Sequence, residues 1–222
     1  MSQFLRVLLL TLAVKLVLAD QVVINQAIDQ LLESAKIILR SRGQDKIHVP
    51  KMDKTFEKKV MKVVTIKGEF QTSEGLFQDT TSLHRTGDVT MNAQGNRLTL
   101  AASMGLSKLA IDFGHYEFSL LAIHSSGSLH AECNDNALSA EITIVHDGPK
   151  CSVELNHARI DRLGNFVVKM TGPDQLNELG SVLFTWILNQ FNENIRSLVN
   201  SHIESAIRES LNKVDLCKMI PH

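Results

Sequence analysis

The sequence has few of the residues that mark several common classes of protein. Of its 222 residues only three are cysteine, four are proline and one is tryptophan, and aromatic residues make up 5%. No CxxC pair occurs, so neither a redox centre nor a structural zinc site is indicated. The HExxH, GxSxG, GxGxxG and phosphate-loop patterns are missing as well. We therefore expect no enzymatic activity and no cofactor.

An excess of positive charge is missing too. The chain has 23 lysines and arginines against 24 aspartates and glutamates. Nucleic-acid binding requires a concentrated basic surface, because contacts to phosphates dominate the affinity. We expect no nucleic-acid partner and no strong electrostatic attraction to anionic lipid.

What the sequence does have at its start is a short apolar run. Arg6 precedes the apolar segment 7–14, Lys15 interrupts it, and Val17-Leu18-Ala19 places small residues where a signal peptidase cuts. A membrane anchor is the alternative, but the run is much shorter than the roughly 20 residues that a bilayer requires. The pattern predicts a signal peptide over residues 1–19. Residues 20–222 are then a secreted, extracellular chain that forms a single domain and has no transmembrane segment.

The first segment after residue 19 has the spacing of an amphipathic helix. Its apolar residues recur every three or four positions, at Ile24, Ile28, Leu31, Ala35 and Ile38. Gly43 is the expected end of this helix. Residues 44–59, with Pro50 and mixed charge, are interpreted as a linker.

Between about Val60 and Met170 the apolar period changes to two, which is typical of half-buried strands. The clearest alternation lies in the segments 64–70, 98–104, 116–122 and 138–144. Turn residues stand at 92–96, 125–127, 134–136 and 147–149. We expect long antiparallel hairpins with one apolar and one solvated face. The apolar group Leu120, Leu121 and Ile123 breaks the alternation and is interpreted as a bulge or a strand covered on both faces.

The most regular pattern lies toward the end of the sequence. After Thr171-Gly172-Pro173-Asp174, apolar residues advance mainly by three or four from Leu176 to Val214. A helix of about forty residues would be about 60 Å long, whereas a compact domain of this size has a radius of gyration of about 16 Å. The domain is therefore elongated, or the helix kinks, for example near Gly180.

The apolar stripe of this helix needs a partner. A coiled-coil dimer is one possibility, but the spacing drifts from a strict heptad. The sheet has an apolar face to cover, and a sheet that wraps around the helix satisfies both elements. The expected fold is α+β, with a long curved antiparallel sheet around the C-terminal helix and an additional N-terminal helix. The oligomeric state is left open.

Three cysteines in a secreted chain predict one disulfide and one remaining thiol. Cys133 and Cys151 share the apolar phase of their strands, and in a simple meander they would lie about 23 Å apart. A disulfide allows only about 7 Å between Cα atoms. Cys217, just past the helix, is therefore expected to bond one of the two and tie the helix to the sheet. Three buried, reduced cysteines are the alternative.

Two further patterns are weaker. The nine histidines are scattered, without the i, i+4 helical pair of zinc enzymes, so no metal site is expected. Ser210 and Lys213 fit an SxxK spacing, but a lysine at a helix end is explained by the helix dipole.

Several short segments carry a resemblance to a known family: His48-Val49-Pro50, residues 54–58, residues 66–70, Gly75-Leu76 and residues 85–89. Together with the order of the helices and strands, they resemble the group 7 mite allergens. These are arthropod relatives of the juvenile-hormone-binding and lipopolysaccharide-binding proteins of the TULIP superfamily. The chain lacks the early cysteine pair of the juvenile-hormone-binding branch. The resemblance implies a sheet rolled around the long helix, an apolar groove for lipid-like ligands and no bond-making chemistry.

Two functions remain to be distinguished. The first is binding of a lipid or another apolar small molecule in a groove between sheet and helices, for transport or sensing. The second is extracellular recognition of a microbial lipopeptide or lipopolysaccharide, or a helix-mediated oligomer whose core is too full for a ligand. The side chains expected to line the groove are Leu98, Leu100, Met104, Phe118, Leu120, Leu183, Ile187, Phe191 and Ile195.

Overall fold

A computed structural model describes the backbone of residues 3–60, 64–121, 123–172 and 180–220, and the side chains of residues 20–55, 57, 67–121, 123–172 and 196–220. The elements are α1 (Gln3–Ser41), β1 (Lys46–Val49), β2 (Asp53–Val60), β3 (Val64–Thr72), β4 (Gly75–Gln78), the 3₁₀ turn η1 (Thr80–Ser82), β5 (Leu83–Arg85), β6 (Thr90–Gln94), β7 (Arg97–Leu106), β8 (Ala110–Leu120), β9 (Ile123–Asp147), β10 (Lys150–Met170), α2 (Gly180–Leu211) and α3 (Leu216–Met219).

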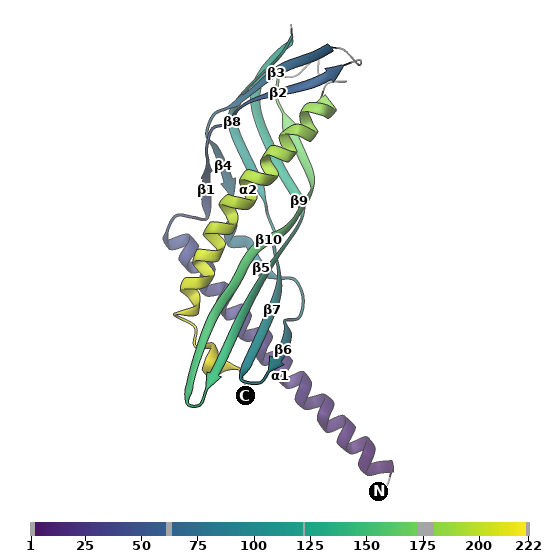
Figure 1. Ribbon diagram of the computed structural model, residues 1–222, viewed down its shortest axis with the longest axis vertical. Helices are drawn as coiled ribbons and strands as arrows, with labels where there is room; N and C mark the ends of the chain where they lie inside the picture. The colour runs from purple at the N-terminus through teal and green to yellow at the C-terminus, as the bar shows by residue number, and fades with distance from the viewer. Residues whose placement is uncertain (1–2, 61–63, 122, 173–179, 221–222) are drawn as a thin grey trace.

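Two long strands form the frame of the molecule. β9 and β10 pair antiparallel from Asp147 with Lys150 to Leu129 with Met170. β9 has 25 residues, which span about 80 Å at the usual rise of a strand. Figure 1 shows the two strands following most of the long axis of an elongated body. The expected elongated shape is present, and these strands provide its length.

The other edge of β9 is shared by two strands placed end to end. β8 pairs with its first part, from Leu120 with Ile123 to Ala110 with Glu132, and β7 pairs with its last part, residues 138–145. The remaining strands join these two, so that β3 and β4 pair with β8, β2 with β3, β1 with β4, and β5 and β6 with β7. All these pairs are antiparallel, and they form one ten-stranded sheet.

A side chain closes the place where β7 ends and β8 begins. The Asn136 side chain accepts a hydrogen bond from the backbone N–H of Leu106 at 2.7 Å and donates one to the Leu106 carbonyl at 2.9 Å. The amide thus reproduces the two hydrogen bonds of a strand pair. We call this junction of β7, β8 and β9 the seam.

Two of the four expected turns are wrong, and both lie inside β9. Residues 134–136 have turn chemistry, but Asn136 uses its amide for the seam, and Asp135 forms an ion pair with Arg162 at 2.9 Å. In the segment 125–127, a Cβ on Gly127 would lie 2.1 Å from the carbonyl oxygen of Thr171. Gly127 therefore permits a close approach of the backbone rather than a turn.

The real turn between β8 and β9 lies where a bulge or a doubly covered strand was expected. Leu120 pairs with Ile123, and Leu121 between them has a φ of 55° and is 71% exposed. A leucine in this region of φ is uncommon, which is why the sequence does not signal the turn. The expected turns near Gly95 and at 147–149 are confirmed, since β6 pairs with β7 and β9 with β10 across them.

The expected linker at 44–59 is wrong as well. It contains β1, in which Ile47 and Val49 are buried and Lys46 and His48 exposed, and it contains most of β2. Two alternations in four residues are too short to be recognised against the mixed charge of the segment.

The N-terminal amphipathic helix is confirmed in α1. Its apolar stripe is buried, with exposures of 3% or less, at Ile24, Ala27, Ile28, Leu31, Leu32, Ala35, Ile38 and Leu39. The helix ends at Ser41, two residues before the expected Gly43, where φ is 66°. The N–H of Gly43 bonds to the carbonyl of Arg40, and the N–H of Gln44 bonds to that of Leu39. This pair of bonds is the Schellman motif, for which glycine is preferred.

Polar contacts fix α1 to the end of β5 and to the segment that follows it. Arg85 donates two hydrogen bonds to Asp29, each of 2.9 Å. Asn25 donates to Asp88 at 2.8 Å and accepts from the backbone N–H of Val89 at 3.0 Å. We call these five residues the α1 clamp. The resemblance segment 85–89 thus supplies the side of the clamp that faces α1.

The second helix, α2, has 32 residues, which correspond to about 48 Å. Residues 173–179 lie outside the described part, and Gly180 is the first residue of α2. The helix ends at Leu211, before the expected Val214, and Asp215 then caps α3 by accepting from the N–H of Lys218. α2 lies along β10, where Asn200 accepts from the N–H of Ile160 at 2.7 Å.

Cys217 forms the disulfide, and its partner is Cys151 on β10, with a Cα–Cα distance of 6.1 Å. Cys133 remains a free, buried thiol. The expected link from the helix end to the sheet is confirmed. The simple meander assumed for Cys133 and Cys151 is wrong, because β9 runs unbroken from Cys133 to Asp147 and only one turn separates it from Cys151 on β10.

Candidate functional site

The strand residues expected to line a groove all lie on or beside the core side of the sheet. Leu100, Met104, Phe118 and Leu120 are at most 5% exposed, and Leu98 is half-buried. They form two groups rather than one. Leu100 pairs with Ile142 and Phe118 with Ser125, and these partners on β9 are separated by about 55 Å of strand.

The four helix residues of the expected lining are Leu183, Ile187, Phe191 and Ile195. They lie on α2, but their side chains are outside the described part of the chain. They remain predictions.

An apolar hollow lies at the end of the body where the chain turns between β6 and β7 and between β9 and β10. This end cavity has a volume of about 530 Å³. Figure 1 shows the lower end, where β6, β7 and the tip of the β9–β10 hairpin approach α1 and the C-terminal segment. Its lining residues are Asp20, Ile24, Met91, Ala93, Gly95, Asn96, Arg97, Leu98, His146, Gly148 and Ile220.

The walls of the end cavity are mainly apolar. Ile24 and Ile220 are buried, Leu98 is half-buried, and Ala93 pairs with Leu98 across β6 and β7. Met91 is 43% exposed although it lines the cavity. The groups that can carry charge are Asp20, Arg97 and His146. The cavity therefore combines an apolar interior with few ionisable groups, as ligand sites commonly do.

The disulfide holds one wall of this cavity in place. Cys217 is bonded to β10, and the N–H of Ile220 bonds to the carbonyl of Leu216 at 3.1 Å. Ile220 therefore follows directly on a covalently fixed turn of helix. Sequence reasoning missed this wall, because the short segment after the helix was considered only for its cysteine.

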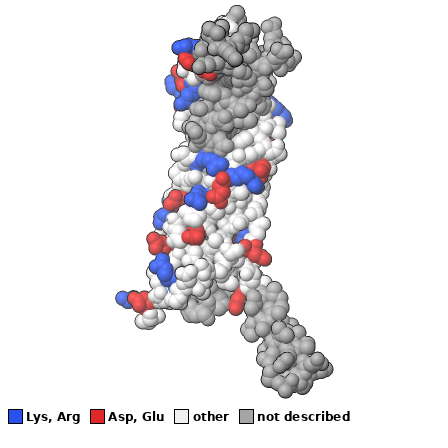
Figure 2. All heavy atoms as spheres, turned by 45° about the vertical axis from the view of Figure 1, so that its right-hand side comes forward, with Lys and Arg blue, Asp and Glu red and all other residues white. Residues whose placement is uncertain are grey.

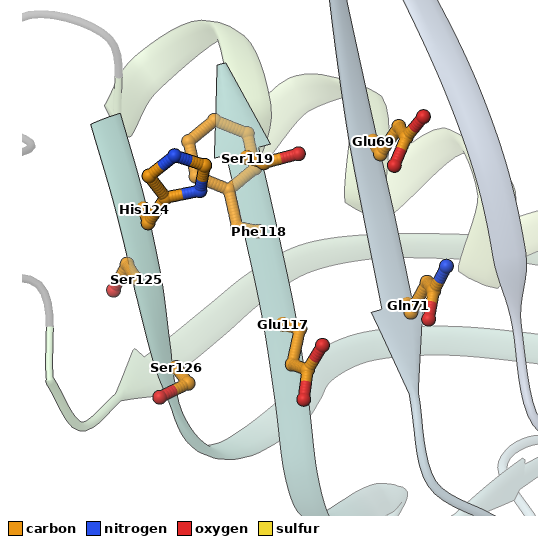
Figure 3. A pocket seen from close by; sticks show the side chains of 8 residues that line it. All are labelled: Glu69, Gln71, Glu117, Phe118, Ser119, His124, Ser125 and Ser126. Carbon is orange, nitrogen blue, oxygen red and sulfur yellow. The ribbon is translucent and has the colours of Figure 1, made fainter. Parts of the chain in front are cut away.

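A second hollow is polar and lies on strands β3, β8 and β9 near the other end (Figure 3). This polar hollow has a volume of about 320 Å³. Its lining residues lie side by side on paired strands, with Glu69 opposite Ser119 and Ser119 opposite His124. Its other lining residues are Gln71, Glu117, Phe118, Ser125 and Ser126. Glu117 is already in contact with His115 at 3.2 Å. A lining dominated by polar groups does not suit an apolar ligand.

The patterns set aside in the sequence have structural explanations. The hydroxyl of Ser210 is buried and donates to the carbonyl of Ala206 at 2.8 Å, while Lys213 forms an ion pair with Glu209 at 2.9 Å. Burial raises the pKa of the Cys133 thiol, whose sulfur contacts the carbonyl of Gly164 at 3.2 Å. A thiol in this state is a poor nucleophile.

The described residues also contain no group of three or more His, Cys, Asp or Glu that could hold a metal ion. Basic and acidic side chains are intermixed along the face seen in Figure 2. In the part of the chain whose helices could be searched, none is long and apolar enough to cross a membrane.

Comparison with known proteins gives a structural relative and a family. Curated proteins yield no match to the chain. Among solved structures, one similar chain is described as the crystal structure of lipopolysaccharide binding protein, with a TM-score of 0.42 and 17% sequence identity. The match covers 86% of this chain and 39% of that chain, so this protein spans well under half of the length of that relative. The model of the Group 7 allergen family matches residues 23–211, and the chain therefore belongs to the Group 7 allergen family.

Proposed function

We propose that the protein is a secreted binding protein that holds an apolar, lipid-like ligand between the sheet and the two long helices. It would transport or sense this ligand without chemical conversion. The observation that carries the proposal is the apolar face of the sheet. Buried side chains of β3, β4, β7, β8, β9 and β10 form one core with the buried stripe of α1 and the end of α2.

The sheet wrapped around α2 is part of this proposal. α2 lies against β10, the disulfide ties the segment after it to the same strand, and Arg42 forms an ion pair with Glu209 between α1 and α2. These contacts place the end of α2 against both the sheet and α1. The groove would run from this packed end toward the first half of α2.

The lining that we propose draws on both groups of strand residues and on α2. Ala102 and Ala140 pair across β7 and β9, and both are buried. Two small side chains at this place leave room for a chain-like ligand beside Leu100 and Met104. The proposed lining is Leu98, Leu100, Met104, Phe118, Leu120, Leu183, Ile187, Phe191 and Ile195.

Secretion is supported by the disulfide, since such bonds persist in oxidising compartments. We propose that residues 1–19 are a signal peptide. The secreted protein should then begin at Asp20, with the sequence Asp-Gln-Val-Val-Ile. N-terminal sequencing of secreted material tests this directly, and an intact N-terminal segment in that material would overturn it.

Native mass spectrometry tests ligand binding. Protein secreted into medium that contains lipid, and purified without detergent, should carry bound mass that solvent extraction releases as lipid. An Ala102→Phe variant should carry less, because the ring occupies space on the apolar face. The matched control is Ala101→Phe, which faces the other side of β7, opposite Glu141 and Thr90.

The proposal fails if wild-type protein carries no lipid and an apolar fluorescent probe does not bind. An oligomer that depends on concentration and carries no ligand would support a helix-mediated interaction module instead.

A further inference from the structure

We propose that the end cavity is a separate binding site for a single-chain amphiphile with an anionic head group, such as a fatty acid. The apolar chain would lie against Ile24, Leu98, Met91 and Ile220, and the head group would pair with Arg97. This site lies at one end of the groove proposed above and shares only Leu98 with its lining. Only the sign of the head group rests on the proposed cleavage before Asp20.

The size and lining of the cavity fit one chain. Its volume of about 530 Å³ falls within the usual range of small-molecule sites, roughly 300–1,000 Å³. Met91 is exposed at its wall, so a bound chain would remove this apolar surface from water. Removal of such surface is the main driving force for apolar ligands.

Arg97 determines the head group. It lines the cavity and is exposed at the start of β7, beside the turn to β6. Arg97 has no ion pair in the described part of the chain, whereas Arg42, Arg85, Arg159 and Arg162 each have one there. A guanidinium at the rim of an apolar cavity is suited to hold a carboxylate by paired hydrogen bonds.

The lining also includes Asp20, whose carboxylate would repel an anion. Cleavage after Ala19 would make Asp20 the first residue. Its new α-amino group, with an ordinary pKa of about 7.7–8.0, would then be mostly protonated at neutral pH and would offset the carboxylate. In the processed chain the two charges of Asp20 therefore cancel, and the net positive charge at the rim of the end cavity comes from Arg97.

The end cavity is distant from Phe118 and Leu120 at the other end of the proposed groove. Leu98 pairs with Ile144 and Leu120 with Ile123, and these positions on β9 are about 70 Å apart. One single-chain molecule cannot reach from the first to the second. Occupancy at the two ends can therefore be changed separately.

A fluorescence titration of the secreted protein with cis-parinaric acid tests the site. Ala93→Trp places an indole in the cavity, and we expect at least tenfold weaker binding of the probe. The matched control is Asn92→Trp on the same strand, since Asn92 pairs with Thr99 on the other face and does not line the cavity. This control should bind as wild type does.

Arg97→Gln tests the head group. The variant should bind the acid about fivefold more weakly, as expected for loss of one charged hydrogen-bonding partner, and should bind parinaric methyl ester as wild type does. Lys150→Gln is the control, because it removes an equal charge near the same hairpin without lining the cavity.

Three results would overturn the site: no binding of the probe to wild type, undiminished binding to Ala93→Trp, or equal losses in both tryptophan variants. Equal affinity of Arg97→Gln and wild type for the acid would overturn the anionic head group. Lipid recovered from wild type by extraction, together with any of these results, would leave the groove intact and reject only the end cavity. If no lipid is extracted from the wild-type protein but Ala93→Trp abolishes binding of the probe, the end cavity is supported and the groove is rejected.

Discussion

The two ends of the molecule have different cores. All aromatic side chains in the described part lie in β3, β4 and β8 or, as Phe166 does, on the part of β10 next to Cys133. We call this end the aromatic half. The other end consists of α1, β6, β7, the hairpin between β9 and β10 and the described part of α2, and its core side chains are aliphatic. We call it the aliphatic half.

The aromatic half is stiffened from inside. The rings of Phe70 and Tyr116 stack with centroids 6.1 Å apart. The Tyr116 side chain is fully buried, and its hydroxyl donates to the carbonyl of Thr171 at 2.9 Å. Rings have few rotatable bonds, and this anchored ring joins β8 to the end of β10.

The aliphatic half is held from its edges. The α1 clamp and the Cys151–Cys217 disulfide connect its helices to the sheet, and the end cavity is lined by Ile24 of α1 and by Ile220, which follows Cys217 closely in the chain. The comparison teaches that a flexible aliphatic core can surround a cavity when cross-links at its border keep the elements in place.

Loss of the disulfide should have the largest effect. Its two cysteines are 66 residues apart, and closing a loop of this length contributes about 4 kcal/mol to stability. Cys217→Ser should lower the free energy of unfolding by this amount, measured by urea denaturation. Hydrogen exchange should accelerate in the aliphatic half before the aromatic half. Cys133→Ser is the control, and an equal loss there would show that the disulfide is not the cause.

Gly127→Ala should weaken the aromatic half selectively. The added methyl group would meet the carbonyl oxygen of Thr171 at 2.1 Å, so the end of β10 must move away. We expect a loss of about 2–3 kcal/mol in denaturation and faster exchange of the N–H of Ser128, which bonds to the Thr171 hydroxyl. Gly114→Ala on β8 has nothing within 4 Å of its Cβ. If both variants were equally stable, the close approach would not be a constraint.

Arg85→Met tests the α1 clamp. The arginine side chain is 18% exposed and makes two hydrogen bonds to Asp29, so its loss should cost about 1–2 kcal/mol. The exposed Arg162, paired with Asp135, offers a control, and Arg162→Met should cost less than about 0.5 kcal/mol. Circular dichroism during thermal unfolding measures both. Equal melting temperatures of the two variants would argue against the clamp.

The smallest predicted effect is a gain. Leu121 holds a φ of 55° at the exposed tip of the β8–β9 hairpin, where asparagine is better tolerated. Leu121→Asn should stabilise the protein by about 0.5 kcal/mol in urea denaturation, whereas Leu121→Ala, which keeps the unfavourable backbone, should not. A destabilised asparagine variant would mean that the leucine side chain contributes contacts of its own.

The periodicity of apolar residues is sufficient to predict the elements that bury one stripe of a helix or one face of a strand. The spacing from Ile24 to Ile38 predicts α1, and the alternation from Leu98 to Met104 predicts β7. In both elements the buried positions need only be apolar, whichever distant residues pack against them, so the pattern is visible in the sequence. The family resemblance is confirmed by the match over residues 23–211, and the α+β class is confirmed by the helices and the antiparallel sheet of the structure.

What periodicity could not reveal depends on distant contacts. The amide of Asn136 has turn chemistry but pairs with Leu106, thirty residues earlier in the chain. Gly127 is a strand residue because of Thr171, and Leu121 forms a turn without a turn residue. The end cavity is formed by four separate stretches of the chain, so no local pattern marks it. In the sequence, the only signal for Arg97 is that a charged residue directly precedes the alternating apolar residues of β7.

The seam has a consequence for the ageing of the protein. Asparagine side chains hydrolyse slowly to aspartate, which would replace the N–H donor of Asn136 by a carboxylate oxygen facing the carbonyl of Leu106. Two acceptors would then oppose each other where one donor and one acceptor now meet. The sheet would lose one of the two hydrogen bonds by which residue 136 connects β9 to the end of β7, since a carboxylate can still accept from the N–H of Leu106. Hydrolysis of the Asn136 amide would thus weaken the junction between the aromatic and aliphatic halves as the protein ages.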